Sequence, residues 1–296
     1  AFRYLDYTCD AAAYRLVQAS RVLVLGAGGG TPILSALTHG AEHVTAVEVD
    51  PSVMGFVRNE LASFSGGLYD LERVHAVLAE GRGFIDGTDE RFDLVFLPLA
   101  GSFAAASAGV HALNESYLYT VEAFERCLEL LREDGVLAAS CWLKTPPRTA
   151  IKLFATAVEA CERARIGAPG ERIALLRSWN NAVVLVARAP LTEGDVALLR
   201  TFCRERNFDL CYYPGIERAE ANRYTILERP VYYEAAQDML SANREGFYDS
   251  YLFHVRPATD QRPYFDRYFT SVSYTHLRAH ETVLDLVCRL LLEKKK

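Results

Sequence analysis

The stretch VLVLGAGGGT, residues 22–31, limits the fold of this chain more than any other part of the sequence. A run of branched apolar residues, typical of a buried strand, passes directly into a glycine-rich turn and then into a stretch that can be helical. Gly26, Gly28 and Gly30 permit the positive φ angles and the open space that such a turn needs beside a ligand. The following helix presents free backbone N–H groups to that ligand. This arrangement predicts a nucleotide site; the alternative is a tight turn that binds nothing.

The first half of the chain alternates short segments rich in Val and Leu with segments that can be helical. Such short apolar runs are typical of strands buried on both faces, and their alternation with helices predicts a parallel sheet. The expected strands are 21–25, 43–48, 73–78, 92–97 and 136–142, and the expected helices are about 31–39, 51–62, 80–87, 117–132 and 147–163.

Two further expected strands, 172–178 and 182–188, are separated only by Trp179-Asn180-Asn181. A helical crossover cannot fit in this gap, so the pair must be antiparallel. The predicted fold class is therefore α/β, with a parallel sheet that ends in an antiparallel hairpin. This order resembles the Rossmann-like sheet of class I methyltransferases more than the six parallel strands of a dinucleotide dehydrogenase.

Acidic residues follow the second and third expected strands. Glu48 ends the second strand, where a carboxylate can accept both hydroxyls of an adenosine ribose, and Asp50 is the fallback for that role. Asp50 followed by Pro51 is also typical of a helix N-cap. Glu80, in AEGRGF, is a candidate acceptor for an adenine amino group, or else a solvated loop acid. The expected nucleotide-binding set is Gly26, Gly28, Gly30, Glu48, Asp50, Glu80 and Gly81.

The fourth strand ends in FLPLAGS, at the sheet edge where catalytic groups commonly lie. Pro98, Leu99 and Ala100 cannot transfer a proton. Asp93 lies at the other end of this strand, and we expect it to be structural.

The segments VLVLGAGGGT, VTAVEVDP, AEGRGFI, ERFDLVFLP and YLYTVEAFERCLELLREDGVLA occur in this order and resemble the spermidine/spermine synthase family. The resemblance covers residues 1 to about 190. It implies that the chain binds S-adenosylmethionine or its decarboxylated form and transfers a methyl or aminopropyl group to a small-molecule acceptor. A homodimer is compatible with it. By this resemblance the adenosyl group is held by Gly26, Gly28, Gly30, Glu48 and Glu80.

Two positions depart from the family pattern. Gly29 stands where the family carries an Asp that holds the aminopropyl ammonium, and Pro98 stands where it carries an Asp that deprotonates the amine acceptor. A cationic diamine needs carboxylates for binding, and its attack needs a base. Methyl transfer tolerates the loss better, because positioning alone can suffice for a nucleophilic acceptor. The two departures favour an acceptor other than a polyamine.

Other residues are candidates to replace the missing acids. Glu115 and Tyr117 lie between the fourth strand and its helix, with His111, Asn114 and Tyr119 nearby; Glu115 is otherwise a first-turn acid that stabilises the helix dipole. The family uses a Tyr near the N-terminus at the acceptor site. Of the residues that precede the first strand, Tyr7 is the best match; its polar neighbours are Tyr4, Asp6 and Asp10.

Two other functions remain open. A non-catalytic nucleotide-binding or regulatory domain is consistent with Gly29 and Pro98. A nicotinamide oxidoreductase shares the glycine loop and the ribose acid, but its fingerprint requires a glycine where this chain has Thr31.

The pattern changes after about residue 190, which gives a predicted nucleotide-binding domain at 1–190 and a C-terminal appendage at 191–271. A helix is expected at 193–206. The segment 207–271 is rich in Tyr, Phe and Arg without clear periodicity. Within it, Asp260, Arg262, Tyr264 and Phe265 either cover the nucleotide pocket or pack the appendage down; we favour packing.

The segments WLKTPPR, NRYTILERPVYYEA and ATDQRPYF resemble bacterial synthase-like proteins whose soluble domain is joined to transmembrane segments. The resemblance implies a parent protein anchored in the inner membrane, of which this chain is the cytoplasmic part. Residues 272–296 resemble a translated sequencing-adaptor read-through, so we expect a non-native tail. The alternative is an amphipathic helix with an apolar face formed by Val283, Leu284, Leu286, Val287, Leu290 and Leu291.

Composition excludes several classes of protein. A net charge of −6 and no long basic run before the last three residues argue against a nucleic-acid partner. None of the seven cysteines lies in a CxxC pair, which predicts reduced thiols with neither a metal site nor a disulfide framework. No run of about 18 apolar residues is present, so we expect no membrane span in this chain.

Overall fold

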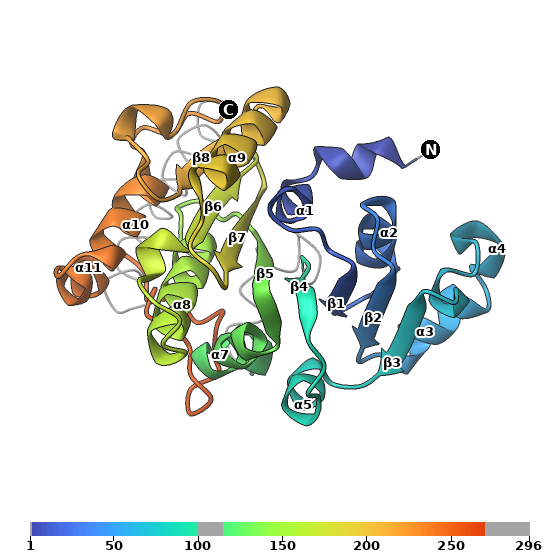
Figure 1. Cartoon of the computed structure of the whole chain (residues 1–296). Coiled ribbons are helices and arrows are strands. Elements are labelled where there is room, and N and C mark those ends of the chain that lie inside the picture. Colours follow the sequence, from blue (N-terminus) through green and yellow to red (C-terminus); the bar gives the residue numbers. More distant parts are fainter. Residues whose placement is uncertain (1, 100–114, 270–296) are drawn as a thin grey trace, which may run out of the picture.

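A computed structural model of the chain describes residues 2–99 and 115–269 (Figure 1). Its centre is an eight-stranded sheet with the order β3-β2-β1-β4-β5-β7-β6-β8. The strands are β1 (Arg21–Leu25), β2 (His43–Glu48), β3 (Val74–Leu78), β4 (Phe92–Leu97), β5 (Leu131–Trp142), β6 (Ile173–Arg177), β7 (Asn181–Ala187) and β8 (Asp209–Tyr212).

The five strands β3, β2, β1, β4 and β5 are parallel, as the alternating pattern predicted. The apolar runs of β1, β2 and β4 are buried on both faces because helices cover the sheet on each side, and every residue of β4 is buried. β3, at the edge of the sheet, is partly exposed. β7 is antiparallel to β5, and β6 is antiparallel to β7, which confirms the predicted hairpin. The fold is therefore an α/β Rossmann-like fold of the class I methyltransferase type.

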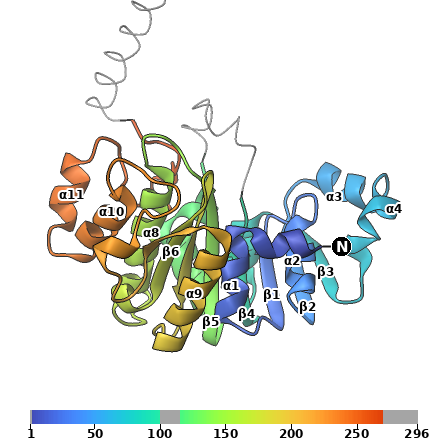
Figure 2. The same cartoon turned by 90° about the horizontal axis from the view of Figure 1, so that it is seen from above.

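Helices cover the sheet on both faces and extend past its β8 end (Figures 1 and 2). Helix α1 packs on α9, and α7 packs on both α5 and α8. The α-helices are α1 (Ala13–Leu16), α2 (Thr31–Thr38), α3 (Pro51–Arg58), α4 (Ala62–Ser65), α5 (Gly81–Gly87), α7 (Val121–Glu129), α8 (Thr149–Arg163), α9 (Glu193–Arg206), α10 (Val231–Leu240) and α11 (Arg244–Ser250). Short 3₁₀ turns are η1 (Arg3–Tyr7), η2 (Cys9–Ala12), η3 (Leu68–Asp70), η4 (Tyr117–Tyr119), η5 (Pro169–Glu171) and η6 (Arg218–Glu220).

The helix expected at 117–132 was wrong at both ends. The Thr120 hydroxyl accepts a hydrogen bond from the N–H of Ala123, so α7 begins only after this cap and η4 precedes it. At the other end β5 already begins at Leu131, which pairs with Phe92 of β4 before an irregularity shifts the register. Gly135 lies in this irregular part of β5.

The helix expected at 51–62 is also interrupted. The structure has α3 up to Arg58 and a separate short α4 from Ala62. The apolar spacing correctly predicted α3, but it did not predict that the helix ends at Arg58 and that a second helix begins at Ala62.

The sheet continues beyond residue 190, because β8 is antiparallel to β6. Arg177 of β6 and Asp209 of β8 form a buried ion pair with an N–O distance of 3.0 Å. The Asp209 carboxylate also accepts hydrogen bonds from the backbone N–H groups of Arg223, Tyr224 and Thr225. One buried carboxylate thus fixes the start of the segment without clear periodicity to the sheet edge.

The segment around Asp260 packs against the start of α7. The Asp260 carboxylate accepts hydrogen bonds from Arg82 at 3.0 Å and from the Thr120 hydroxyl at 2.7 Å, and its N–H donates to Glu122 at 3.0 Å. These contacts fit the packing role that we favoured for this cluster. In the part of the chain that the structure describes, no helix combines the length and the apolar character that crossing a bilayer requires.

Candidate active site

The glycine loop between β1 and α2 has the predicted backbone conformation. Gly26, Gly28 and Gly30 have φ angles of 98°, 52° and 91°, which residues with a side chain rarely adopt. The N–H groups of Gly26 and Ala27 donate to the Val47 carbonyl at 2.9 and 3.0 Å, which ties the loop to β2. An added Cβ at Gly26 or Gly28 would meet no heavy atom within 4 Å, so the loop borders open space that a ligand can fill.

Glu48 lies at the end of β2 and is buried. One carboxylate oxygen accepts from the Gly28 N–H at 2.7 Å, and the other accepts from the N–H groups of Val49 and Asp50 at 3.0 and 2.9 Å. An ionised carboxylate has about four lone-pair sites. Glu48 therefore shapes the glycine loop and retains capacity for about one more donor, such as a ribose hydroxyl.

Tyr69, in η3, supports the glycine loop, although its sequence context gave no sign of this role. Its buried hydroxyl donates to the Gly28 carbonyl at 2.6 Å, and burial raises its pKa to about 12, so the group stays a neutral donor. Nothing in the local sequence marks this role, because Tyr69 follows β1 by more than forty residues and meets the loop only in the folded chain.

Asp50 and Glu80 both cap helices. The Asp50 carboxylate accepts from the Ser52 N–H at 2.8 Å at the start of α3, as the N-cap alternative predicted. The Glu80 carboxylate accepts from the N–H groups of Arg82 and Gly83 at the start of α5. Gly81 is buried, and a Cβ there would lie 2.7 Å from Leu118. Both acids stand at the carboxyl edge of the sheet, where we predicted them.

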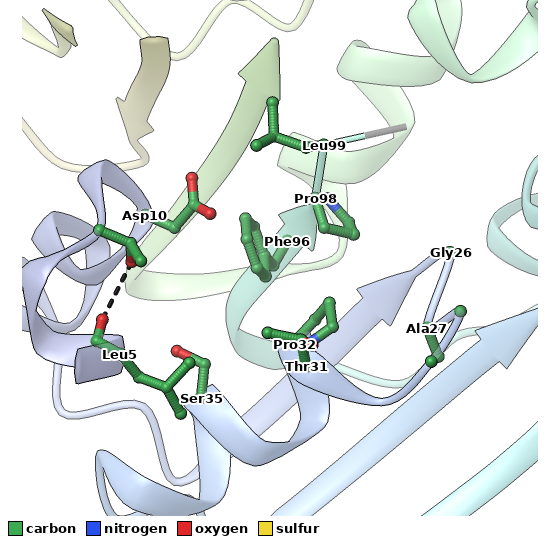
Figure 3. A pocket seen from close by; sticks show the side chains of 13 residues that line it. Leu5, Asp10, Gly26, Ala27, Thr31, Pro32, Ser35, Phe96, Pro98 and Leu99 are labelled. Carbon is green, nitrogen blue, oxygen red and sulfur yellow. Dashed lines mark hydrogen bonds between the residues drawn. The ribbon is translucent and has the colours of Figure 1, made fainter. Parts of the chain in front are cut away.

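A cavity of about 280 Å³ opens beside the glycine loop (Figure 3). This volume is near the lower limit for small-molecule sites, so it suits a reacting tail better than a whole nucleoside. Glu48 and Glu80 do not line it. The lining residues come from η1–η2, the glycine loop, α2 and the end of β4: Leu5, Thr8, Asp10, Gly26, Ala27, Gly28, Gly29, Thr31, Pro32, Ser35, Phe96, Pro98 and Leu99.

Asp10 is the one carboxylate among these lining residues. Its side chain accepts a hydrogen bond from the Ser140 hydroxyl of β5, and burial raises its pKa to about 6. The sequence analysis grouped Asp10 with the polar residues before β1 but gave it no role. Its position depends on how η2 folds back across the sheet, and no sequence motif predicts that course of the chain.

The other candidates for the missing acids lie elsewhere. Tyr7 is 62% exposed, packs under the Arg206 guanidinium and does not line the cavity. Glu115 is exposed and Tyr117 is 40% exposed at η4, outside the cavity lining. His111 and Asn114 lie outside the described residues. Gly29 and Pro98 do line the cavity, so the two departures from the family pattern both fall at its wall.

Six cysteines, Cys9, Cys127, Cys141, Cys161, Cys203 and Cys211, are buried free thiols. Within residues 2–99 and 115–269, no group of three or more His, Cys, Asp or Glu side chains is placed to hold a metal ion.

Comparison with known proteins decides the family. Residues 2–159, more than half of the chain, match the family model of the spermine/spermidine synthase domain. The chain belongs to this family. A polyamine aminopropyltransferase of Serratia proteamaculans is 30% identical over 131 residues, covering 43% of this chain and 42% of the relative. A polyamine aminopropyltransferase of Korarchaeum cryptofilum is 28% identical over 117 residues, covering 40% of this chain and 34% of the relative.

The chain therefore spans about two-fifths of the length of the Serratia proteamaculans relative and about one-third of the Korarchaeum cryptofilum relative. Among solved structures, spermidine synthase from Thermotoga maritima is 20% identical, covers 78% of this chain and 73% of its own, and has a TM-score of 0.49. A spermidine synthase in complex with the transition-state analogue AdoDATO has 21% identity, the same coverage and the same TM-score.

Proposed function

We propose that this member of the spermine/spermidine synthase family transfers the aminopropyl group of decarboxylated S-adenosylmethionine to an amine. The observation that carries the proposal is the cavity that has the glycine loop as one wall and a single carboxylate, Asp10, as another. The curated relatives named polyamine aminopropyltransferase support the same reaction.

The residues of this site divide into two groups. The loop at Gly26–Gly28, fixed from below by Glu48 and Tyr69, offers backbone groups and open space to the nucleoside. The cavity beyond the loop receives the reacting tail of the donor and the acceptor. The donor supplies a carbon already activated by its sulfonium, so the protein has to align the acceptor nitrogen with that carbon and exclude water.

The bond changes follow from this chemistry. The acceptor nitrogen forms a bond to the methylene carbon beside the sulfonium, and the carbon–sulfur bond breaks with its electron pair remaining on sulfur. The products are methylthioadenosine and a substituted ammonium, which then loses one proton to a base.

Methyl transfer from S-adenosylmethionine is the second candidate. It is favoured by Gly29 and Pro98, which leave the cavity without an acid at either family position. Methyl transfer to a nucleophilic acceptor requires alignment more than a charged anchor. A domain that binds the nucleotide without turnover is the third reading of the same two residues.

A thermal-shift series on the full chain tests the proposal. The ligands are decarboxylated S-adenosylmethionine, S-adenosylmethionine, methylthioadenosine, NAD and NADP. We expect the adenosyl-sulfur ligands to raise the melting temperature by several degrees, because a ligand at 100 times its Kd adds about 2.7 kcal/mol to stability. NAD and NADP should produce no shift.

Turnover separates the candidates. We expect methylthioadenosine to accumulate when the full chain is mixed with decarboxylated S-adenosylmethionine and 1,4-diaminobutane. S-adenosylhomocysteine from S-adenosylmethionine would instead support methyl transfer. Binding without either product would support the non-catalytic reading, and no binding of any adenosyl ligand would overturn the proposal.

A further inference from the structure

The charge of Asp10 has no counter-ion in the part of the chain that the structure describes. Its carboxylate accepts a hydrogen bond from the Ser140 hydroxyl, and no cation contributes to its environment. Three other titratable groups lie near it, namely Cys9, Tyr14 and Cys141, and burial raises the pKa of each, so all three stay neutral at physiological pH. A partly buried carboxylate without a counter-ion is costly unless a cation binds it.

Asp10 reaches the carboxyl edge of the sheet beside position 98. Leu97 at the end of β4 pairs with Ala139 of β5, so Pro98 and Ser140 are the next residues along the two strands. Because the Ser140 hydroxyl donates to Asp10, the carboxylate of η2 stands at this edge of the sheet, and Asp10 and Pro98 both line the cavity. The element η2 thus supplies an acid at the edge where β4 ends.

The segment that carries Asp10 is fixed in place. The Arg206 guanidinium of α9 donates to the Asp6 carbonyl at 2.6 Å and to the Asp6 carboxylate at 2.7 Å. Leu5 and Cys9 are buried, which anchors the turn on both sides of Asp6. Asp10 is therefore held by packing and not by a flexible loop.

The cavity around Asp10 is otherwise apolar on the β4 side. Figure 3 shows the Asp10 side chain facing the space that Phe96, Pro98 and Leu99 border. An acid at one end of an apolar wall matches a ligand with a positive charge on a hydrocarbon chain.

We propose that Asp10 is the amine-binding residue of this cavity: its carboxylate pairs with the ammonium group of an aliphatic amine whose carbons lie against Phe96, Pro98 and Leu99. This inference rests on the proposed function for the identity of the donor, but it concerns the amine alone. Asp10 would thus supply, from η2, the negative charge of a cavity wall that β4 leaves apolar.

Amine binding should then depend on pH in one direction. The pKa of Asp10 is raised to about 6, so the carboxylate is charged at pH 7.5 and mostly protonated at pH 5. The aliphatic ammonium stays charged over this range, and so the affinity should fall about tenfold between pH 7.5 and pH 5.

The test is calorimetric titration of the full chain with 1,4-diaminobutane and 1-aminobutane, with and without saturating methylthioadenosine. The variants are Asp10→Asn and, as a matched control, Glu133→Gln, which removes an exposed carboxylate near the opposite edge of the sheet. We expect Asp10→Asn to weaken amine binding at least tenfold and to leave methylthioadenosine binding unchanged. Glu133→Gln should change neither.

The wild-type chain gives a second readout that needs no variant. 1,4-Butanediol has the shape of the diamine without its charge, so we expect it to bind at least tenfold more weakly at pH 7.5. Equal binding of diol and diamine, an affinity for amines that is the same at pH 5 and 7.5, or unchanged amine binding in Asp10→Asn would overturn the inference. Failure of methylthioadenosine to bind would instead overturn the proposed function.

Discussion

At the scale of single residues, the two carboxylates of this site, Glu48 and Asp10, have different roles. Glu48 accepts three backbone N–H groups, fixes the glycine loop and keeps room for about one more donor. Asp10 has one hydroxyl donor and faces a cavity. The sequence predicted Glu48 because a strand, a glycine turn and an acid occur at fixed spacing. The sequence did not single out Asp10, because its hydrogen-bond partner Ser140 is 130 residues away in the chain.

Replacement of Glu48 should damage both stability and binding. Glu48→Ala removes the acceptor of three backbone N–H groups, so we expect the free energy of unfolding to fall by about 1–3 kcal/mol and adenosyl binding to weaken by at least about 1.5 kcal/mol. Urea unfolding and calorimetry with methylthioadenosine measure the two effects. Glu42→Gln, an exposed acid just before β2, is the control. Unchanged affinity in Glu48→Ala would show that the ribose is held elsewhere.

Replacement of Asp10 should stabilise the fold while it harms binding. The folded-state pKa of Asp10 is raised to about 6, so the folded chain binds more protons than the unfolded chain between pH 4 and 6, and stability falls as pH rises through that window. Asp10→Asn removes this penalty. We expect its melting temperature to exceed that of the wild type by a few degrees at pH 7.5 and the difference to shrink below pH 6. A variant that is less stable at pH 7.5 and equally affected at pH 4 would contradict this.

At the scale of elements, the strands followed from the sequence, but the ends of the helix expected at 117–132 did not. Runs such as RVLVL are buried on both faces, and burial on both faces requires an uninterrupted apolar run. The start of α7 depends on the cap at Thr120, and its end depends on the pairing of Leu131 with Phe92 of β4. The second contact joins residues that are distant in sequence, so periodicity alone placed the helix end too late.

The turn between β1 and α2 offers a paired test of backbone strain. Gly30 has a φ of 91°, and a Cβ there would lie 2.5 Å from Leu68. Gly29 has neither a positive φ nor a neighbour within 4 Å. We expect Gly30→Ala to lower the free energy of unfolding by about 1–3 kcal/mol and Gly29→Ala to change it by less than about 0.5 kcal/mol. Chemical denaturation of both variants measures the difference, and equal values would show that the loop relaxes freely.

At the scale of the whole molecule, one sheet runs through both predicted domains. The sequence predicted its parallel half and its hairpin, because each strand there has its own apolar run. It did not predict β8, a strand of only four residues whose stability comes from Arg177 on β6. The cavity, in turn, draws on η1–η2, the glycine loop and β4, so no single segment of the sequence contains it.

The ion pair between Arg177 and Asp209 at the far edge of this sheet is a buried electrostatic link to the C-terminal segment. Asp209 is fully buried, and its removal leaves the Arg177 guanidinium buried with less compensation. We expect Asp209→Ala to destabilise the fold by about 3–5 kcal/mol. Glu245→Gln, which breaks an exposed pair with Arg256, should cost less than about 1 kcal/mol. Denaturant unfolding compares the two, and a small effect at Asp209 would mean that β8 adds little to stability.

The hydrogen bonds between Arg206 and Asp6 have a consequence for the folding of the chain during its synthesis on the ribosome. The two residues are 200 positions apart, and translation at 5–20 residues per second separates their appearance by roughly 10 to 40 s. During that interval β1, β2 and β4 can already assemble, while the turn that carries Asp10 still lacks the arginine that holds it down. The segment that carries Asp10 is thus synthesised early but reaches its final position only after Arg206 has been synthesised.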